Sequence, residues 1–140
     1  MMGWNTGTAA RTIWQEARGE PLIGQQAVAH VLVNRAADGR WGKTLSEVCL
    51  WHMQFSGWRS IDPNFSAACR LPDTDPNLVA YAGLISAAMA HEPDPTGAAL
   101  FYYALSIPQP GWAATMRKCG TFGHQVFLSD RPGAGPVAMS

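Results

Sequence analysis

The chain has 140 residues, which is enough for one domain with one hydrophobic core. Apolar residues make up 47% of the sequence, a content that excludes a disordered chain. The 10 basic residues balance the 10 acidic ones, so the basic excess of nucleic-acid binders is absent, and no apolar run is long enough to span a bilayer. We therefore expect no nucleic-acid partner and no membrane insertion.

The first part of the chain predicts two helices. Ala9, Ile13 and Ala17 are spaced four apart, which predicts a helix over about 8–18. Gly19 and Pro21 would end this helix. Pro21 also suits the first turn of a second helix, which we expect over about 21–37. The apolar repeat of this second helix consists of Ala27, Val28, Val31 and Leu32.

Two further helices carry sequence signals for their first residues. Thr44 and Glu47 have the spacing of a capping box, which predicts a short helix over about 45–52. Asp75 before Pro76 predicts an N-cap and a helix that reaches about His91. Its expected core face consists of Leu78, Ala82, Ile85 and Met89. Between these helices, the polar residues 53–74 predict a long surface loop.

The last part of the chain predicts a small β element. Residues 94–97 (Asp-Pro-Thr-Gly) predict a turn, and the aromatic stretch 99–104 suits a strand. Strands over 117–120 and 124–129 would form a hairpin. The predicted fold class is α+β, a mostly helical single domain over residues 1–130 with a small β-hairpin or sheet near its C-terminal part. Residues 131–140 should fray as a flexible tail.

Glu16 is the first candidate for catalysis. It lies near the end of the first predicted helix, where a carboxylate meets the negative end of the helix dipole. Partial burial would add to this effect and favour the protonated form that a general acid needs near neutral pH. The alternative is a solvated helix-end glutamate paired with Arg11 or Arg18. Position alone leaves both interpretations open.

A longer pattern around Glu16 resembles a known family. Residues 16–21 (Glu-Ala-Arg-Gly-Glu-Pro), followed by matches within 24–35, resemble the opening of the SleB-type cell-wall hydrolases, which include spore-cortex-lytic enzymes and phage lysins. The resemblance extends over about residues 9–128. Its later and shorter pieces are Gln54-Phe55-Ser56, the turn at 94–97, Phe101-Tyr102-Tyr103 and residues 123–127.

The resemblance implies a lysozyme-like fold and cleavage of peptidoglycan glycan strands between N-acetylmuramic acid and N-acetylglucosamine. It also implies lytic transglycosylation with one catalytic glutamate, which here is Glu16. Hydrolytic glycosidases usually need two carboxylates. A lytic transglycosylase needs one, which protonates the leaving oxygen and then deprotonates the muramic C6 hydroxyl. Since this mechanism uses no cofactor, we expect none. We also expect a monomer. A hydrolytic muramidase with a second carboxylate is the alternative function.

Six residues are candidates for substrate binding beside Glu16. Glu20 lies four residues after Glu16, so the two would share one face of a continuous helix. Glu20 is either a structural group that caps the next helix or pairs with Arg35, or a second carboxylate of the site. The full set of substrate-binding candidates is Glu20, Gln54, Phe55, Ser56, Tyr103 and His124.

The remaining candidates divide between binding and structural roles. Gln54 can hydrogen-bond N-acetyl groups, and Phe55 either packs beneath a sugar or anchors its loop in the core. Tyr102 and Tyr103 alternate on the predicted strand, so one points inward and one outward. We assign Tyr103 to the cleft. His124 either donates a hydrogen bond in the cleft or orients the hairpin.

The three cysteines, Cys49, Cys69 and Cys119, are expected to be reduced thiols. Cys49 and His52 are three apart, but no Cys-x-x-Cys pair accompanies them, so we expect no metal site. A Cys49–Cys69 disulfide that brackets the loop is an alternative. A cysteine peptidase with His52 or His124 as its base is a competing function, although His52 on the same short helix has a poor position for it.

The N-terminus lacks a charged segment followed by an apolar one, so we expect no secretory signal. This pattern favours a phage or prophage endolysin, made in the host cytoplasm and released to the wall through a holin. An exported bacterial enzyme whose signal has been removed is the alternative. A catalytically silent glycan-binding module on the same fold is a further competitor, and the presence of Glu16 argues against it.

Overall fold

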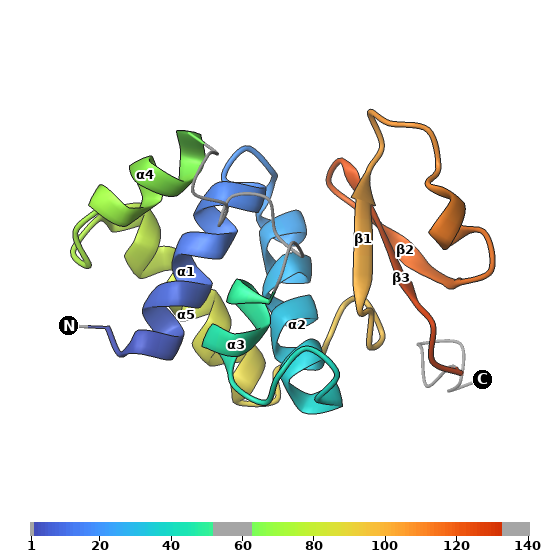
Figure 1. The fold of residues 1–140 in the computed structure, drawn as a ribbon, viewed down its shortest axis with the longest axis horizontal. Coiled ribbons are helices and arrows are strands. Elements are labelled where there is room, and N and C mark those ends of the chain that lie inside the picture. The colour runs from blue at the N-terminus through green and yellow to red at the C-terminus, as the bar shows by residue number, and fades with distance from the viewer. Residues whose placement is uncertain (1, 52–62, 133–140) are drawn as a thin grey trace.

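The computed structural model describes residues 2–51 and 63–132 and consists of a group of helices beside a small sheet (Figure 1). The helices are α1 (Trp4–Ala17), α2 (Leu22–Asp38), α3 (Leu45–Leu50), α4 (Pro63–Arg70) and α5 (Pro76–Met89). The strands are β1 (Phe101–Ala104), β2 (Arg117–Phe122) and β3 (Gln125–Ser129), with the short 3-10 helix η2 (Gly111–Ala113) between β1 and β2. These elements confirm the predicted α+β class.

Helix α1 is the centre of the helical part and packs against all four other helices of the described chain (Figure 1). The predicted apolar repeat of α1, Ala9, Ile13 and Ala17, is buried. Two of these three side chains are alanines, which let neighbouring helices approach closely. The predicted repeat of α2 is also buried. The core therefore forms around α1, whose C-terminal end carries Glu16.

Local signals determine where several helices begin and end. The Thr44 hydroxyl accepts from the Glu47 amide and the Glu47 carboxylate accepts from the Thr44 amide, which is the predicted capping box. The Asp75 side chain caps the first turn of α5, as predicted. Gly39 ends α2 with φ +90°, a left-handed conformation that glycine adopts at little cost.

The sheet is antiparallel with the order β1-β3-β2, so β3 is the central strand. Tyr102 pairs with Phe127, and Tyr103 pairs with Val126. Alternate residues of a strand point to opposite faces. Tyr102 and Phe127 accordingly join the core on the helical side, whereas Tyr103 and Val126 pack with Ala113 of η2 on the other side. Because both faces are covered, every residue of β3 is buried.

The prediction of a surface loop over 53–74 is wrong in its second part, because α4 occupies residues 63–70. The sequence has an Asp-Pro pair at residues 62–63, which is the same signal that predicted α5. Pro63 occupies the first helical position, which its fixed φ suits.

Three boundaries and one face also differ from the predictions. Helix α1 begins at Trp4, earlier than predicted, because Gly3 precedes it without a side-chain cap that the sequence would reveal. Strand β1 is confined to 101–104, and β2 extends to Phe122. On α5, Met89 is 53% exposed, and Ala88 is buried instead. None of the described helices is both long and apolar enough to cross a bilayer.

Candidate active site

Glu16 lies at the C-terminal end of α1 and contacts the first strand of the sheet. The Tyr102 hydroxyl of β1 donates a hydrogen bond to Glu16 Oε1 at 3.1 Å. Glu16 is half-buried. The carboxyl group at the end of α1 therefore also contacts the sheet.

Tyr102 is a stable hydrogen-bond donor to this carboxyl group. Burial of the phenol raises the pKa of Tyr102 well above its ordinary value, and the negative charge of Glu16 acts in the same direction. The ring of Tyr102 packs against that of Phe127, with centroids 5.4 Å apart. Tyr102 therefore keeps its proton at neutral pH and has a fixed position relative to Glu16.

The sequence Asn34-Arg35 on α2 positions the start of β1, and thereby Tyr102. Asn34 Nδ2 donates to the Ala99 carbonyl at 3.0 Å, and Arg35 Nε donates to the Leu100 carbonyl at 2.7 Å. Arg35 is 5% exposed, and its guanidinium lies 4.5 Å from the ring centroid of Trp41. Burial lowers the pKa of Arg35 to about 10, so the side chain remains a cation at neutral pH.

Asp94 organises the predicted turn that leads into β1. Its carboxylate accepts from the Thr96 amide at 2.8 Å, the Thr96 hydroxyl at 2.7 Å and the Ala98 amide at 3.0 Å. Asn34 Nδ2 donates to the same carboxylate at 2.9 Å. Burial opposes ionisation of Asp94, but the hydrogen bonds from Asn34 and Thr96 outweigh it and lower the pKa. The Asp94 carboxylate thus has a structural role in this turn.

A pocket of about 320 Å³ lies next to the Glu16–Tyr102 pair, because Tyr102 forms part of its wall. The described residues that line it combine a cation, a phenol and apolar side chains, and they are Arg35, Phe101, Tyr102, Trp112 and Met116. None of these is acidic. Aromatic walls with a few polar groups are typical of sites for small organic ligands and sugars.

Glu20 contacts the β2–β3 hairpin instead of the expected Arg35 or the first turn of α2. Its Oε1 accepts from the His124 amide at 2.7 Å, and its Oε2 lies 3.3 Å from His124 Nδ1. Gly123 has φ +63°, and a Cβ there would lie 2.5 Å from Glu20 Oε1. A side chain at residue 123 would displace the Glu20 carboxylate, and glycine adopts this positive φ at little cost. This geometry supports the structural interpretation of Glu20 and His124.

Of the remaining predicted binding residues, the structure describes Tyr103, which does not contact Glu16. Tyr103 lies on the opposite face of the sheet from Tyr102, and its ring packs edge-on against Trp112 with centroids 6.1 Å apart. The candidates Gln54, Phe55 and Ser56 lie outside the described residues, as does most of the predicted tail over 131–140. The structure thus brings Tyr102, and not Tyr103, into contact with Glu16.

The cysteines are all free, so the Cys49–Cys69 disulfide that we considered is absent. Cys49 is buried on α3, whereas Cys69 is exposed on α4. Burial raises the pKa of the Cys49 thiol to about 12, which disfavours the thiolate that a cysteine peptidase needs. Among residues 2–51 and 63–132, no group of three or more His, Cys, Asp or Glu side chains is placed to hold a metal ion.

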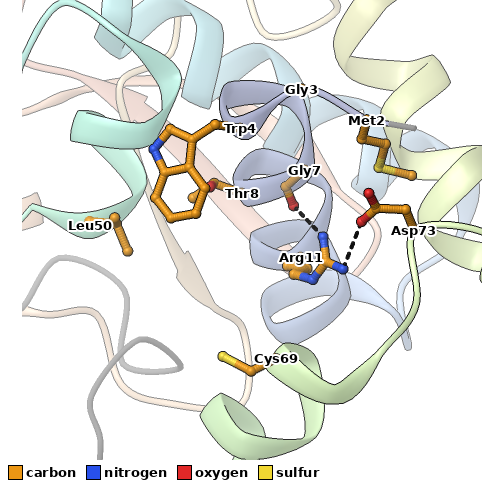
Figure 2. A pocket seen from close by; sticks show the side chains of 9 residues that line it. All are labelled: Met2, Gly3, Trp4, Gly7, Thr8, Arg11, Leu50, Cys69 and Asp73. Carbon is orange, nitrogen blue, oxygen red and sulfur yellow. Dashed lines mark hydrogen bonds and ion pairs between the residues drawn. The ribbon is translucent and has the colours of Figure 1, made fainter.

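A larger pocket, of about 570 Å³, lies at the opposite end of α1 (Figure 2). Trp4 and Leu50 flank one side of it, and the ion pair between Arg11 Nη2 and Asp73 Oδ1, at 3.0 Å, lies on the other. Arg11 is also bonded to backbone carbonyls at the end of α4. The charged groups of this pocket are thus engaged with each other and with the backbone.

None of the five described residues that line the pocket beside Tyr102 was among the predicted site residues. Tyr102 was one of two alternating tyrosines, and only its pairing with Phe127 shows that it faces the helices. Trp112 follows Pro110-Gly111 in a segment without periodicity, so its position next to Phe101 has no sequence signal. The only hint in the sequence was its aromatic character.

Comparison with known proteins identifies the family of the chain. A family model described as Cell Wall Hydrolase matches residues 19–128, a segment that begins just after Glu16. The spore cortex-lytic enzyme of Bacillus cereus is 29% identical over 84% of this chain, and that of Oceanobacillus iheyensis is 30% identical over the same share. The chain spans about two fifths of the length of these relatives, 41% and 39% respectively.

Two solved structures share the fold. One is the catalytic domain of the germination-specific lytic transglycosylase SleB from Bacillus anthracis, with a TM-score of 0.72, 25% identity and coverage of 91% of this chain and 97% of that one. The other is the catalytic domain of the Bacillus cereus SleB protein, with a TM-score of 0.73, 25% identity and coverage of 92% and 93%. The chain therefore belongs to the cell wall hydrolase family and has the fold of the SleB catalytic domains.

Proposed function

We propose that this protein cleaves the glycan strands of peptidoglycan between N-acetylmuramic acid and N-acetylglucosamine, as a monomeric lytic transglycosylase with Glu16 as its catalytic residue. The observation that carries this proposal is the half-buried Glu16 carboxyl group, held by Tyr102 next to an aromatic pocket. The SleB relatives support it, since the Bacillus anthracis protein is a germination-specific lytic transglycosylase.

The proposed reaction begins with the protonated Glu16. Its carboxyl group donates the proton to the glycosidic oxygen, the bond from that oxygen to C1 of the muramic residue breaks, and positive charge develops at C1. The Glu16 carboxylate then removes the proton from the C6 hydroxyl of the same sugar. The C6 oxygen bonds to C1 and forms a 1,6-anhydro ring, and Glu16 regains its proton. No water is consumed.

Tyr102 supports both steps. Its hydroxyl donates to Glu16 Oε1 whether the carboxyl group is protonated or ionised, so it fixes the orientation of the group throughout the cycle. It also stabilises the carboxylate that forms after the first proton transfer. Because the pKa of Tyr102 is raised, the phenol does not compete with Glu16 as an acid or base near neutral pH.

The engagement of other carboxylates favours transglycosylation over hydrolysis. Glu20 is held by the backbone amide and the ring of His124, and Asp94 accepts four hydrogen bonds within its turn and from Asn34. Neither is placed by these contacts to activate a water. The muramic C6 hydroxyl belongs to the reacting sugar, so its effective concentration exceeds that of a loosely held water.

The test is a digest of purified peptidoglycan, with the soluble fragments separated and identified by mass spectrometry. We expect fragments that end in 1,6-anhydro-N-acetylmuramic acid, lighter by one water than the hydrolytic products. A digest with reducing ends alone would identify a hydrolytic muramidase, and Glu20 and Asp62 would become the candidates for its second carboxylate. Absence of any glycan cleavage by the folded protein would favour the glycan-binding alternative.

For the biological setting, we propose that the protein is a phage or prophage endolysin that acts on the wall after release through a holin. The test expresses the protein in the cytoplasm of a bacterial host with and without a holin. Lysis that requires the holin is the expected result. Lysis that instead requires a fused export signal and is insensitive to the holin would support the exported bacterial enzyme.

A further inference from the structure

Trp112 is a large aromatic side chain that contacts two other aromatic rings and yet remains 47% exposed. It lies on η2, a three-residue 3-10 helix that follows Pro110. Its ring contacts Phe101 with centroids 5.8 Å apart and Tyr103 with centroids 6.1 Å apart. An aromatic ring supported from two sides loses little conformational entropy when a ligand stacks on it.

The position of Trp112 connects it to the candidate catalytic group. Trp112 and Tyr102 line the same pocket, and Tyr102 bonds to Glu16. Arg35 provides a cation in this pocket, and Met116 adds a flexible apolar wall. The pocket volume of about 320 Å³ lies at the lower end of the range for small-ligand sites, which suits a single sugar ring.

From this juxtaposition we infer that Trp112 is a stacking platform for one N-acetylhexosamine ring of the glycan strand, next to the bond that is cleaved at Glu16. The apolar C–H face of the sugar would lie on the Trp112 ring, and its N-acetyl group would contact Met116 and the polar groups of Arg35 and Tyr102. The identity of the ligand rests on the proposed function, whereas the existence of the platform rests on the contacts of Trp112.

The same geometry gives Tyr103 a positioning role. Tyr103 was predicted to line the cleft, but its ring supports Trp112 from the side, together with Phe101. Tyr103 thus acts on the sugar through Trp112. Nucleobases also stack on tryptophan, but the formal net charge of zero provides no electrostatic attraction for a nucleic-acid strand.

The experiment measures binding in the absence of cleavage. The full chain with Glu16→Gln is titrated with the β-1,4-linked tetramer of N-acetylglucosamine by calorimetry, alone and combined with Trp112→Ala, Trp112→Phe or Trp4→Ala. Trp4 is a matched control because it is also an exposed tryptophan, at 70%, and lies at the end of α1 opposite to Glu16. We expect Trp112→Ala to raise Kd about tenfold, Trp112→Phe to raise it less, and Trp4→Ala to leave it unchanged.

Fluorescence keeps the inference testable if Trp112→Ala does not fold. Addition of the tetramer should change the tryptophan emission of the Glu16→Gln protein, and Trp112→Phe, which keeps an aromatic ring, should abolish that change. Equal affinity in the folded Trp112→Ala and parent proteins, an emission change that survives in Trp112→Phe, or no binding of the tetramer at all would each overturn the platform. Failure of the proposed function is recognised separately, as tetramer binding by a wild-type protein that does not cleave peptidoglycan.

Discussion

One pocket lies at the N-terminal end of α1, and another lies beside β1, where Tyr102 bonds to Glu16 at the C-terminal end of α1. The pocket at the N-terminal end is the larger, about 570 Å³ against about 320 Å³ for the pocket beside β1. Its charged side chains, Arg11 and Asp73, form an ion pair with each other (Figure 2). The pocket beside β1 is lined by a phenol with a raised pKa, which bonds to a half-buried carboxyl group, and by a buried arginine.

Our proposal places the function at the smaller pocket, so it does not rely on pocket size. Among the described residues of the larger pocket, the two charged side chains, Arg11 and Asp73, pair with each other. Tyr102 lines the smaller pocket and donates to Glu16, which comes from a separate element and lies at the end of a helix, where the dipole opposes a negative charge. The raised pKa of Tyr102 is a perturbation of the kind that clusters at functional sites. The following predictions test this contrast.

The largest expected effect is that of Glu16→Gln. This substitution keeps the shape of the side chain but removes its proton transfer, so we expect a loss of at least ~100-fold in the rate of peptidoglycan solubilisation. The matched substitution at the other end of α1 is Asp73→Asn, which removes the charge partner of Arg11 and should leave the rate unchanged. Solubilisation of purified cell walls, followed by turbidity, measures both.

The roles of the two glutamates of the motif are compared in the same assay. Glu20→Gln should have a milder effect than Glu16→Gln, because its contacts are with His124 in the hairpin turn. A near wild-type rate for Glu16→Gln, or a larger loss for Glu20→Gln, would reverse the roles assigned to these residues.

Tyr102→Phe should have the next largest effect. The substitution removes the hydroxyl that donates to Glu16 and keeps the ring that packs on Phe127. Because a hydrogen bond to a charged group is lost, we expect kcat to fall about tenfold while the fold remains intact. Tyr103→Phe is the control, since its ring contact with Trp112 is kept. Equal losses in the two variants would contradict the special position of Tyr102.

Asp38→Asn should affect stability rather than activity. Asp38 is bonded to Arg40 at 2.8 Å and to Arg131 at 3.0 Å, which joins the end of α2 to the residues after β3. The hydrogen bond from Arg40 is the main cause that lowers the pKa of Asp38 from 3.8 to about 2. We expect the substitution to cost about 1 kcal/mol of the free energy of unfolding at neutral pH.

The pH dependence of this contribution follows from the direction of the shift. A carboxyl group whose pKa is lowered by folding stabilises the folded state above its ordinary pKa. The contribution of Asp38 is therefore present above about pH 4 and is lost as the pH falls through about 2. Urea unfolding of both proteins across this interval should show their stabilities converging. A constant difference would contradict the ion-pair assignment.

The smallest effect is expected from thiol modification. Cys69 is exposed and lines the larger pocket, so alkylating reagents should modify it first. Cys49 is buried with a raised pKa and should react slowly. Because no sulfur takes part in the proposed reaction, the protein modified at Cys69 should keep its activity, measured alongside mass-spectrometric mapping. Complete inactivation of a folded, alkylated protein would favour the cysteine-peptidase alternative.

Contacts between residues that are close in the sequence could be predicted, whereas contacts between distant residues could not. The capping box at Thr44 and the N-cap at Asp75 are local, and both were predicted correctly. Glu16 was a candidate because its position near a helix end is also a local property. The contact between Glu16 and Tyr102 depends on the register of β1 with β3 and on the docking of the sheet against the helices. No local pattern encodes either arrangement.

The central claim, that Glu16 catalyses cleavage without an activated water, is tested most directly by the source of oxygen in the products. Peptidoglycan is digested in water enriched in the heavy oxygen isotope, and the new muramic ends are examined by mass spectrometry. Transglycosylation predicts 1,6-anhydro ends without heavy oxygen, since the C6 oxygen of the substrate closes the ring. Reducing ends that carry one heavy oxygen each from the first moments of the digest would show that water attacks C1 and would contradict the claim.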